Sequence, residues 1–144
     1  MESYFILDSQ ISASSEHSAG LGARNARLNL HAVPGVRHGS WSSGHLDFNQ
    51  WLQVDFKKTV TVAKVATQGR MDANQWVTSY SLSYSTDGNN FQEYQQSGVV
   101  KVRINRSTFK QKQNDIHLIK QKGSVGVSQI MLYNTNSYLI GNPS

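Results

Sequence analysis

The most constraining feature of this sequence is an alternation of side-chain size that runs from residue 76 to residue 84. Larger side chains stand at Trp76, Thr78, Tyr80, Leu82 and Tyr84, and serines stand at positions 79, 81 and 83. Successive side chains of a β-strand point to opposite faces, so a period of two is typical of a strand that is buried on one side. The segment therefore predicts a β-strand rather than a helix.

Other segments repeat this pattern at short intervals. In residues 51–56, Leu52, Val54 and Phe56 alternate with polar side chains, and residues 59–67 are enriched in β-branched side chains. Residues 85–89 read Ser-Thr-Asp-Gly-Asn, which is the composition of a turn. Short strands separated by turn residues, without a competing helical periodicity, predict an all-β sandwich or barrel.

The chain between residues 14 and 49 interrupts this regularity, because five glycines and Pro34 break any periodic pattern. Irregular segments of that length inside a compact domain are usually functional. At 144 residues the chain has the size of one domain, and the absence of cysteine excludes a disulfide, a thiolate zinc site and a cysteine nucleophile. We therefore expect one β domain whose long loops present side chains to a partner.

Seven sequence blocks stand in a characteristic order. They are Asp8–Ser15, Ala26–Asn29, Gly39–Trp41, Gln50–Phe56, Ala66–Arg70, Trp76–Tyr80 and Tyr84–Gly88. Together they resemble the discoidin domain, also called the coagulation factor V/VIII type C domain. The resemblance covers about residues 5–96, so a discoidin-like domain is expected over residues 5–98. Residues 99–144 form a divergent basic tail, which either supplies substitute strands, near 99–104 and 125–132, or leaves the sandwich incomplete.

The resemblance implies a jelly-roll β-sandwich of about eight strands, with three ligand-binding loops at one end. These loops correspond to about residues 16–25, 30–38 and 71–75. The family resembled consists of recognition modules that bind glycans, proteins or anionic phospholipid, not of enzymes. Phe5-Ile6-Leu7 is too short an apolar run for a secretory signal. We therefore expect the domain to act outside the cell or at its surface as part of a larger protein.

Candidate ligand-binding residues are the polar, cationic and aliphatic side chains of the three loops. They are His17, Leu21, Arg24, Arg37, His38, Arg70, Met71 and Asn74. The few aliphatic side chains among them suit weak membrane insertion at most, whereas histidine, arginine and asparagine suit the hydroxyl groups of a glycan. We therefore expect a glycan or protein partner, with anionic phospholipid, contacted by Leu21 and the arginines, as the alternative. No cofactor is expected, and nothing in the sequence indicates a structural calcium ion.

Trp51, Trp76 and Arg27 are interpreted as structural residues rather than as ligand contacts. Trp51 and Trp76 stand at the starts of expected strands and are predicted to lie in the core, while the place of Trp41 stays open. Arg27 stands beside an apolar residue in one of the seven blocks, and we expect it to make a structural salt bridge or hydrogen bond.

The histidines do not predict an enzyme or a metal site. His31, His38 and His45 are seven residues apart, but Pro34 and the neighbouring glycines exclude the helix that would align their side chains. Asn105-Arg106-Ser107 is a candidate N-glycosylation sequon.

The net charge of +5 would suit a nucleic-acid partner, but its distribution argues against one. Residues 1–100 carry seven basic and eight acidic side chains, whereas residues 101–144 carry seven basic and one acidic. Because the basic character belongs to the tail rather than to the loops, no nucleic-acid partner is expected.

Overall fold

A computed structural model describes residues 6–60, 62–77, 80–96, 99–100, 109–110, 116–123 and 127–134. The described residues contain eleven strands and three short 3-10 helices, which confirms the prediction of an all-β fold. The strands are β1 (Ile11–Ala13), β2 (Trp41–Ser42), β3 (Gln50–Val60), β4 (Val62–Gln68), β5 (Tyr80–Ser85), β6 (Gln92–Glu93), β7 (Gln95–Gln96), β8 (Val99–Val100), β9 (Phe109–Lys110), β10 (Ile116–Gly123) and β11 (Val127–Asn134). The 3-10 helices are η1 (Asp8–Gln10), η2 (Ala19–Leu21) and η3 (Ala23–Asn25).

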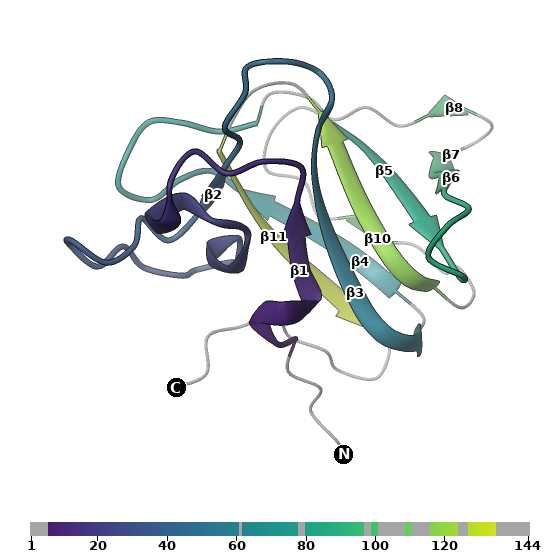
Figure 1. Ribbon diagram of the computed structural model, residues 1–144. Helices are drawn as coiled ribbons and strands as arrows, with labels where there is room; N and C mark the ends of the chain where they lie inside the picture. The colour runs from purple at the N-terminus through teal and green to yellow at the C-terminus, as the bar shows by residue number, and fades with distance from the viewer. Residues whose placement is uncertain are drawn as a thin grey trace.

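The strands form a sandwich of two layers (Figure 1). One sheet has the order β1-β3-β10-β5-β6 and the other the order β2-β11-β4-β9, while β7 and β8 form a separate pair. Every pairing is antiparallel. Antiparallel strands that are neighbours in a sheet but distant in sequence are typical of sandwich folds, in which long connections cross from one sheet to the other.

Strands from the last third of the chain take interior positions in both sheets. β10 lies between β3 and β5, where Ile119 pairs with Val54 on one side and Tyr84 on the other. β11 pairs with β2 and β4, and it is the strand expected near residues 125–132. β8 contains the first two residues of the strand expected over 99–104, of which 101–104, like the Asn105 sequon, lie outside the described residues.

The core lies between the two sheets and follows the alternation read from the sequence. Leu52 and Val54 of β3 and Leu82 of β5 are buried, each separated by one residue from the next core position on its strand. Trp41 of β2 is also buried, and its Nε1 donates a hydrogen bond of 2.9 Å to the carbonyl oxygen of Ser15. This bond satisfies the one polar atom that a buried indole carries.

The predicted core positions of Trp51 and Trp76 are wrong. β5 begins at Tyr80, so Trp76 lies in the preceding loop and is 44% exposed. Trp51 is half-buried, because β3 directs the adjacent Leu52 into the core and successive strand residues face opposite ways. Within the described residues, the alternation from Tyr80 onward therefore belongs to β5, whereas Trp76 does not.

Arg27 has the structural role that was predicted for it. The residue is buried, its Nη1 donates to the carbonyl oxygen of Ile6 at 2.9 Å, and its Nη2 pairs with Asp8 Oδ1 at 2.5 Å. Its Nε donates to the carbonyl oxygen of Arg24 at 3.2 Å. A buried guanidinium needs such partners for its donors, and these contacts tie the irregular segment after β1 to the start of the domain.

Candidate ligand-binding loops

Two loops and the 3-10 helix η2 lie side by side at one end of the sandwich (Figure 1). This end lies away from η1 and from the end of β11. The two loops are residues 30–38 and residues 69–77. The helix η2 lies within the loop predicted at about residues 16–25. The His38 amide donates to the carbonyl oxygen of Gly20 at 2.9 Å. The His38 ring in turn contacts residue 72 in the other loop. The three segments predicted from the family resemblance are therefore neighbours in space.

Residues 33–37 form a narrow hairpin that supports His38. The Val33 amide donates to the Arg37 carbonyl at 2.7 Å, and the Arg37 amide donates back to the Val33 carbonyl at 3.0 Å. Pro34 fixes one turn dihedral, and Gly35 takes a φ of +74°, which side chains other than glycine rarely adopt. Arg37 Nε donates to the His31 carbonyl at 3.2 Å, so Arg37 helps to hold its own loop.

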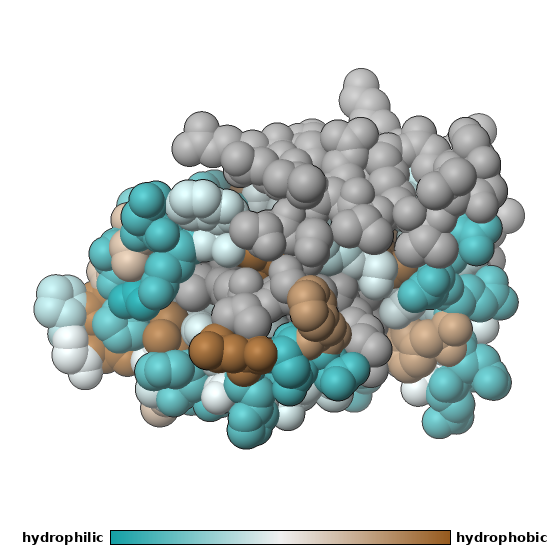
Figure 2. Space-filling model, turned by 90° about the horizontal axis from the view of Figure 1, so that it is seen from above, coloured by the Kyte–Doolittle hydropathy of each residue, from teal (hydrophilic) through white to brown (hydrophobic). Residues whose placement is uncertain are grey.

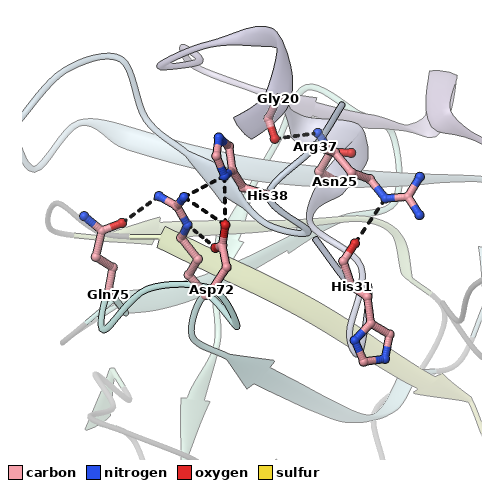
Figure 3. Close-up of polar contacts among 8 residues, drawn as sticks. Gly20, Asn25, His31, Arg37, His38, Asp72 and Gln75 are labelled. Carbon is pink, nitrogen blue, oxygen red and sulfur yellow. Dashed lines mark hydrogen bonds and ion pairs between the residues drawn. The ribbon is translucent and has the colours of Figure 1, made fainter. Parts of the chain in front are cut away.

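Four side chains from the two loops form what we call the polar cluster: His38, Arg70, Asp72 and Gln75. Arg70 donates from Nε and Nη2 to the two carboxylate oxygens of Asp72, the second contact measuring 3.1 Å, and from Nη1 to Gln75 Oε1 at 3.0 Å. The Arg70 amide donates to the Gln75 carbonyl at 2.9 Å, which closes the loop. Figure 3 shows the side chains of His38, Asp72 and Gln75 gathered around these contacts, which are drawn as dashed lines. A guanidinium that grips a carboxylate with two donors has a defined orientation.

The His38 ring connects the cluster across the loops. Its Nδ1 lies 2.7 Å from Arg70 Nη2 and 2.8 Å from Asp72 Oδ2. When Nδ1 carries a proton it donates to Asp72, and when it does not it accepts from Arg70. Arg70, followed by His38, holds the pKa of the Asp72 carboxyl well below its usual range, so Asp72 is an anion at neutral pH. The His38 ring can therefore hydrogen-bond to Asp72 or to Arg70, depending on whether Nδ1 carries a proton.

A pocket of about 640 Å³ lies beside the polar cluster. It is lined by residues 18–20 from the start of η2, by residues 32–38 and by Asp72. Glycine and apolar residues make up most of this lining, so its few polar side chains decide which groups it can recognise.

The structure brings together only some of the sequence-predicted site residues. His38 and Arg70 belong to the polar cluster, and Arg37 supports the adjoining hairpin. Met71 stands between Arg70 and Asp72 in the sequence and is 46% exposed. The remaining exposed candidates lie outside the cluster, and they are His17, Arg24 and Asn74. Leu21 is 6% exposed, because η2 directs it into the domain, so the interpretation of Leu21 as a membrane contact is corrected.

Sequence reasoning missed Asp72, Gln75 and the exposure of Trp76. An Arg and an Asp separated by one residue in a turn could have indicated a bidentate pair, since both side chains then reach the same side of the turn. Nothing in the sequence relates Asp72 to His38, which is 34 residues away.

Two classes of site find no support within the described residues. No group of three or more His, Cys, Asp or Glu side chains in that part of the chain lies close enough to hold a metal ion. No helix formed by those residues has the length and apolar character needed to span a membrane.

Known proteins with this architecture identify the family. Residues 10–133 match the model of the F5/8 type C domain, a stretch that extends beyond residue 98 and includes β10 and most of β11. Bovine lactadherin is 36% identical over 105 residues, which cover 68% of this chain and 24% of lactadherin. The structure of discoidin II from Dictyostelium discoideum superposes with a TM-score of 0.72 at 26% identity, covering 93% of this chain and 55% of that one.

More distant structures share the fold. A carbohydrate-binding module from Clostridium perfringens, solved in complex with GalNAc-β-1,3-galactose, has a TM-score of 0.61 at 20% identity over 88% of this chain and 94% of its own. The chain thus spans about a quarter of lactadherin and about half of discoidin II. The neighbours confirm the jelly-roll β-sandwich, and the family match together with the lactadherin and discoidin II similarity establishes that this chain belongs to the F5/8 type C, or discoidin, domain family.

Proposed function

We propose that this domain is a recognition module that binds a neutral carbohydrate through the polar cluster and the adjoining pocket. The F5/8 type C domain is a binding module rather than an enzyme, although some structural neighbours are parts of enzymes. The observation that carries the proposal is that the cluster is polar and partly exposed, yet its charges are paired. Arg70 is matched by Asp72 inside the cluster.

Charge pairing favours a ligand with hydroxyl groups over one with a net charge. A phosphate or carboxylate would have to compete with Asp72 for Arg70, whereas a hydroxyl group can donate to the carboxylate and accept from the guanidinium at the same time. The side chains of Asp72 and His38 are 29% and 45% exposed, so both can be reached from solvent. Donors and acceptors therefore stand side by side, as a sugar requires.

Trp76 supplies the apolar surface that such a site also needs. It follows Gln75 directly, and a Cβ on Gly69 would lie 2.9 Å from the Gln75 carbonyl oxygen and 3.0 Å from the Trp76 Cβ, so this part of the loop is closely packed. Trp76 is thereby held next to Gly69, while much of it stays exposed. An exposed aromatic ring next to hydrogen-bonding groups can contact the apolar C–H face of a pyranose while its hydroxyl groups bind the cluster.

The family match and the similarity to lactadherin and discoidin II support a binding role, and they do not identify the ligand of this chain. A carbohydrate-binding module and a lectin domain complexed with Lewis B antigen share the fold at identities near 20%, a likeness that concerns the fold alone. We further propose that the glycan is displayed on a cell surface or matrix protein and that the domain acts outside the cell within a longer protein, as the partial coverage of lactadherin suggests.

Anionic phospholipid is a weaker candidate for the same loops. Its apolar contact was expected to be Leu21, which is buried, and one of its cations, Arg70, is already paired. The side chain of Arg70 is also only 14% exposed, which leaves little of it for a lipid headgroup.

Replacing His38 tests the carbohydrate proposal. We expect the full chain to bind neutral oligosaccharides on a glycan array, and His38→Ala to weaken the best of these interactions by about 10-fold, the effect of losing one well-placed hydrogen bond to a charged network. Isothermal titration calorimetry with the best oligosaccharide measures the change.

His17→Ala is the matched control, because His17 is exposed in the same region but lies outside the cluster. It should bind like the original chain. A chain that binds no neutral glycan, or a His38→Ala variant of unchanged affinity and unchanged melting temperature, would contradict the proposal.

A further inference from the structure

One ring nitrogen of His38 lies between two charged partners that make opposite demands on it. Its Nδ1 is 2.7 Å from Arg70 Nη2, which can only donate a hydrogen bond, and 2.8 Å from Asp72 Oδ2, which as a carboxylate can only accept one. A ring nitrogen carries either a lone pair or a proton, so it cannot satisfy both partners at once. Figure 3 shows both contacts starting from this atom. The proton on Nδ1 therefore decides which of the two contacts is a hydrogen bond.

The fold holds the His38 ring at this position. The His38 amide donates to the Gly20 carbonyl at 2.9 Å, and a Cβ added to Gly20 would lie 3.3 Å from the ring carbon Cδ2. The next residue, Gly39, has a φ of +68° and lies so close to the Leu30 carbonyl that it leaves no room for a side chain. The backbone at the ring is thus fixed, so a change of protonation at Nδ1 acts on the contacts between the two loops.

Charged groups approach the His38 ring from two sides. The facing loop contributes Arg70 and Asp72, and the ring's own hairpin contributes Arg37, whose Nε donates to a carbonyl of the same loop. The η2 side of the pocket contributes residues 18–20, which carry no titratable side chain. Asp72 keeps its charge between pH 5 and pH 8, because Arg70, followed by His38, holds the pKa of its carboxyl well below the usual range. Histidine is the side chain whose charge ordinarily changes within that interval.

The two protonation states of His38 present different groups to a sugar. With Nδ1 unprotonated, the ring accepts from Arg70, its Nε2 carries the proton, and Asp72 Oδ2 keeps a lone pair for a hydroxyl group of the ligand. With Nδ1 protonated, the ring donates to that same oxygen, and Arg70 Nη2 loses its acceptor. The guanidinium and imidazolium cations then also repel each other. Protonation thus occupies the acceptor that a hydroxyl group needs and weakens the contact between the loops.

We propose that protonation of His38 releases a neutral carbohydrate from the polar cluster, so that the domain binds its ligand at neutral pH and dissociates from it near pH 5. This inference rests on the proposed function, since it describes the regulation of the same site. The His38 side chain is 45% exposed, so a proton from solvent reaches the ring without an opening of the loops. Because linkage is reciprocal, a sugar that favours the unprotonated ring should release part of a proton when it binds near pH 6.

Isothermal titration calorimetry at neutral pH and near pH 5 tests this proposal with the best neutral oligosaccharide from the glycan array. We expect the full chain to bind about 10-fold more weakly near pH 5, the effect of losing one hydrogen bond to a charged group. His38→Asn is the informative variant, because its side-chain oxygen can accept from Arg70 near the place of Nδ1 but does not titrate. The affinity of this variant should be the same at both pH values.

His17→Asn controls for the removal of a titrating histidine, because His17 is exposed in the same region but lies outside the cluster. It should keep the pH dependence of the original chain, and circular dichroism at both pH values shows whether each protein is folded. Nitrogen-15 NMR of the histidine rings provides a measurement without ligand. The Nδ1 atom of His38 should lack a proton at neutral pH and carry one near pH 5.

The carbohydrate proposal and the pH dependence fail in different ways. A chain that binds no neutral oligosaccharide at neutral pH contradicts the carbohydrate proposal, and the pH dependence falls with it. Equal affinity at the two pH values, or the same loss of affinity in His38→Asn, overturns only the pH dependence. An Nδ1 atom that already carries a proton at neutral pH overturns it too, because the hydrogen bond to Asp72 would then be present throughout. Unfolding of the original chain near pH 5 would also overturn it.

Discussion

The polar cluster and the β2–β3 loop occupy the same end of the sandwich but are held in different ways. The cluster joins two loops through side chains, and its central Arg70 is largely buried. Residues 43–49 of the β2–β3 loop are held by hydrogen bonds among themselves, to Gln50 and to Ser15, while Leu46 and Phe48 contribute to none of these bonds. These two side chains are 82% and 74% exposed, and Figure 2 shows hydrophobic surface over the loop, among hydrophilic neighbours. The side chains proposed to bind a ligand in the first region therefore also hold the fold, whereas Leu46 and Phe48 in the second region do not.

This difference has a consequence for mutagenesis. Substitutions in the cluster should change stability and ligand binding together, because the same contacts serve both. Substitutions of Leu46 and Phe48 should leave the stability nearly unchanged. Measurements of the free energy of unfolding for variants in both regions can therefore test this difference, even before a ligand is identified.

The largest expected effect is at Gly39, which follows the cluster histidine directly. Gly39 has a φ of +68°, and a Cβ there would overlap the Leu30 carbonyl group. Left-handed backbone strain and overpacking against backbone each cost roughly 1–3 kcal/mol, so Gly39→Ala should lower the free energy of unfolding by about 3 kcal/mol. Urea denaturation measures this change.

Gly35→Ala provides the comparison for Gly39. Gly35 also has a positive φ, +74°, but nothing lies within 4 Å of the position that a Cβ would take. Its substitution should cost only the backbone strain, about 1 kcal/mol. Equal losses at the two positions would show that the close approach of the Leu30 carbonyl does not matter.

The next largest effect is expected from Asp72→Ala. Removal of the carboxylate leaves the guanidinium of Arg70 without its bidentate partner, and a mostly buried donor without a partner costs about 1–3 kcal/mol. We expect a loss near 2 kcal/mol in urea denaturation and a smaller loss for Asp72→Asn, which keeps an acceptor oxygen. An Asp72→Ala variant as stable as the original chain would show that the cluster does not hold the loops.

The pH dependence of this loss follows from the lowered pKa of Asp72. A carboxyl group whose pKa is lower in the folded than in the unfolded chain stabilises the fold fully above its unfolded value, about 3.9, and loses that effect as the pH falls toward the folded value. The part of the difference between the original chain and Asp72→Ala that comes from ionisation of the carboxyl should therefore be complete above about pH 5 and shrink below about pH 4.

Strand positions could be predicted from the sequence because they depend on a local pattern. The alternation of Leu52 and Val54 sets the inner face of β3. The structural salt bridge and hydrogen bonds of Arg27 were expected from its place beside an apolar residue in one of the seven blocks. β10 was not predicted, because its sequence, Ile-His-Leu-Ile-Lys-Gln-Lys-Gly, combines adjacent apolar residues with charges and has no clear period. Its pairing with β3 and β5 depends on strands that are distant in sequence.

The site was only partly predictable, since exposure and long-range contacts decide it. His38 and Arg70 were identified as candidates, but their common partner Asp72 was not, because the contact between the loops is formed only by the fold. Leu21 and Leu46 both stand in glycine-containing loops, yet η2 buries the first and the β2–β3 turn exposes the second. Hydrophobicity alone does not distinguish these two cases.

The smallest expected effect completes the comparison. Leu46→Ser/Phe48→Ser should leave the free energy of unfolding within about 0.5 kcal/mol of the original value, because highly exposed side chains lose little on replacement. The two substitutions also leave every hydrogen bond of the loop in place, since Asp47, Ser43 and Gly44 make those bonds. Urea denaturation alongside Asp72→Ala measures both regions under the same conditions. A loss of 2 kcal/mol in the double variant would mean that Leu46 and Phe48 support the fold, and the division between a structural cluster and two exposed apolar side chains without a structural role would then be wrong.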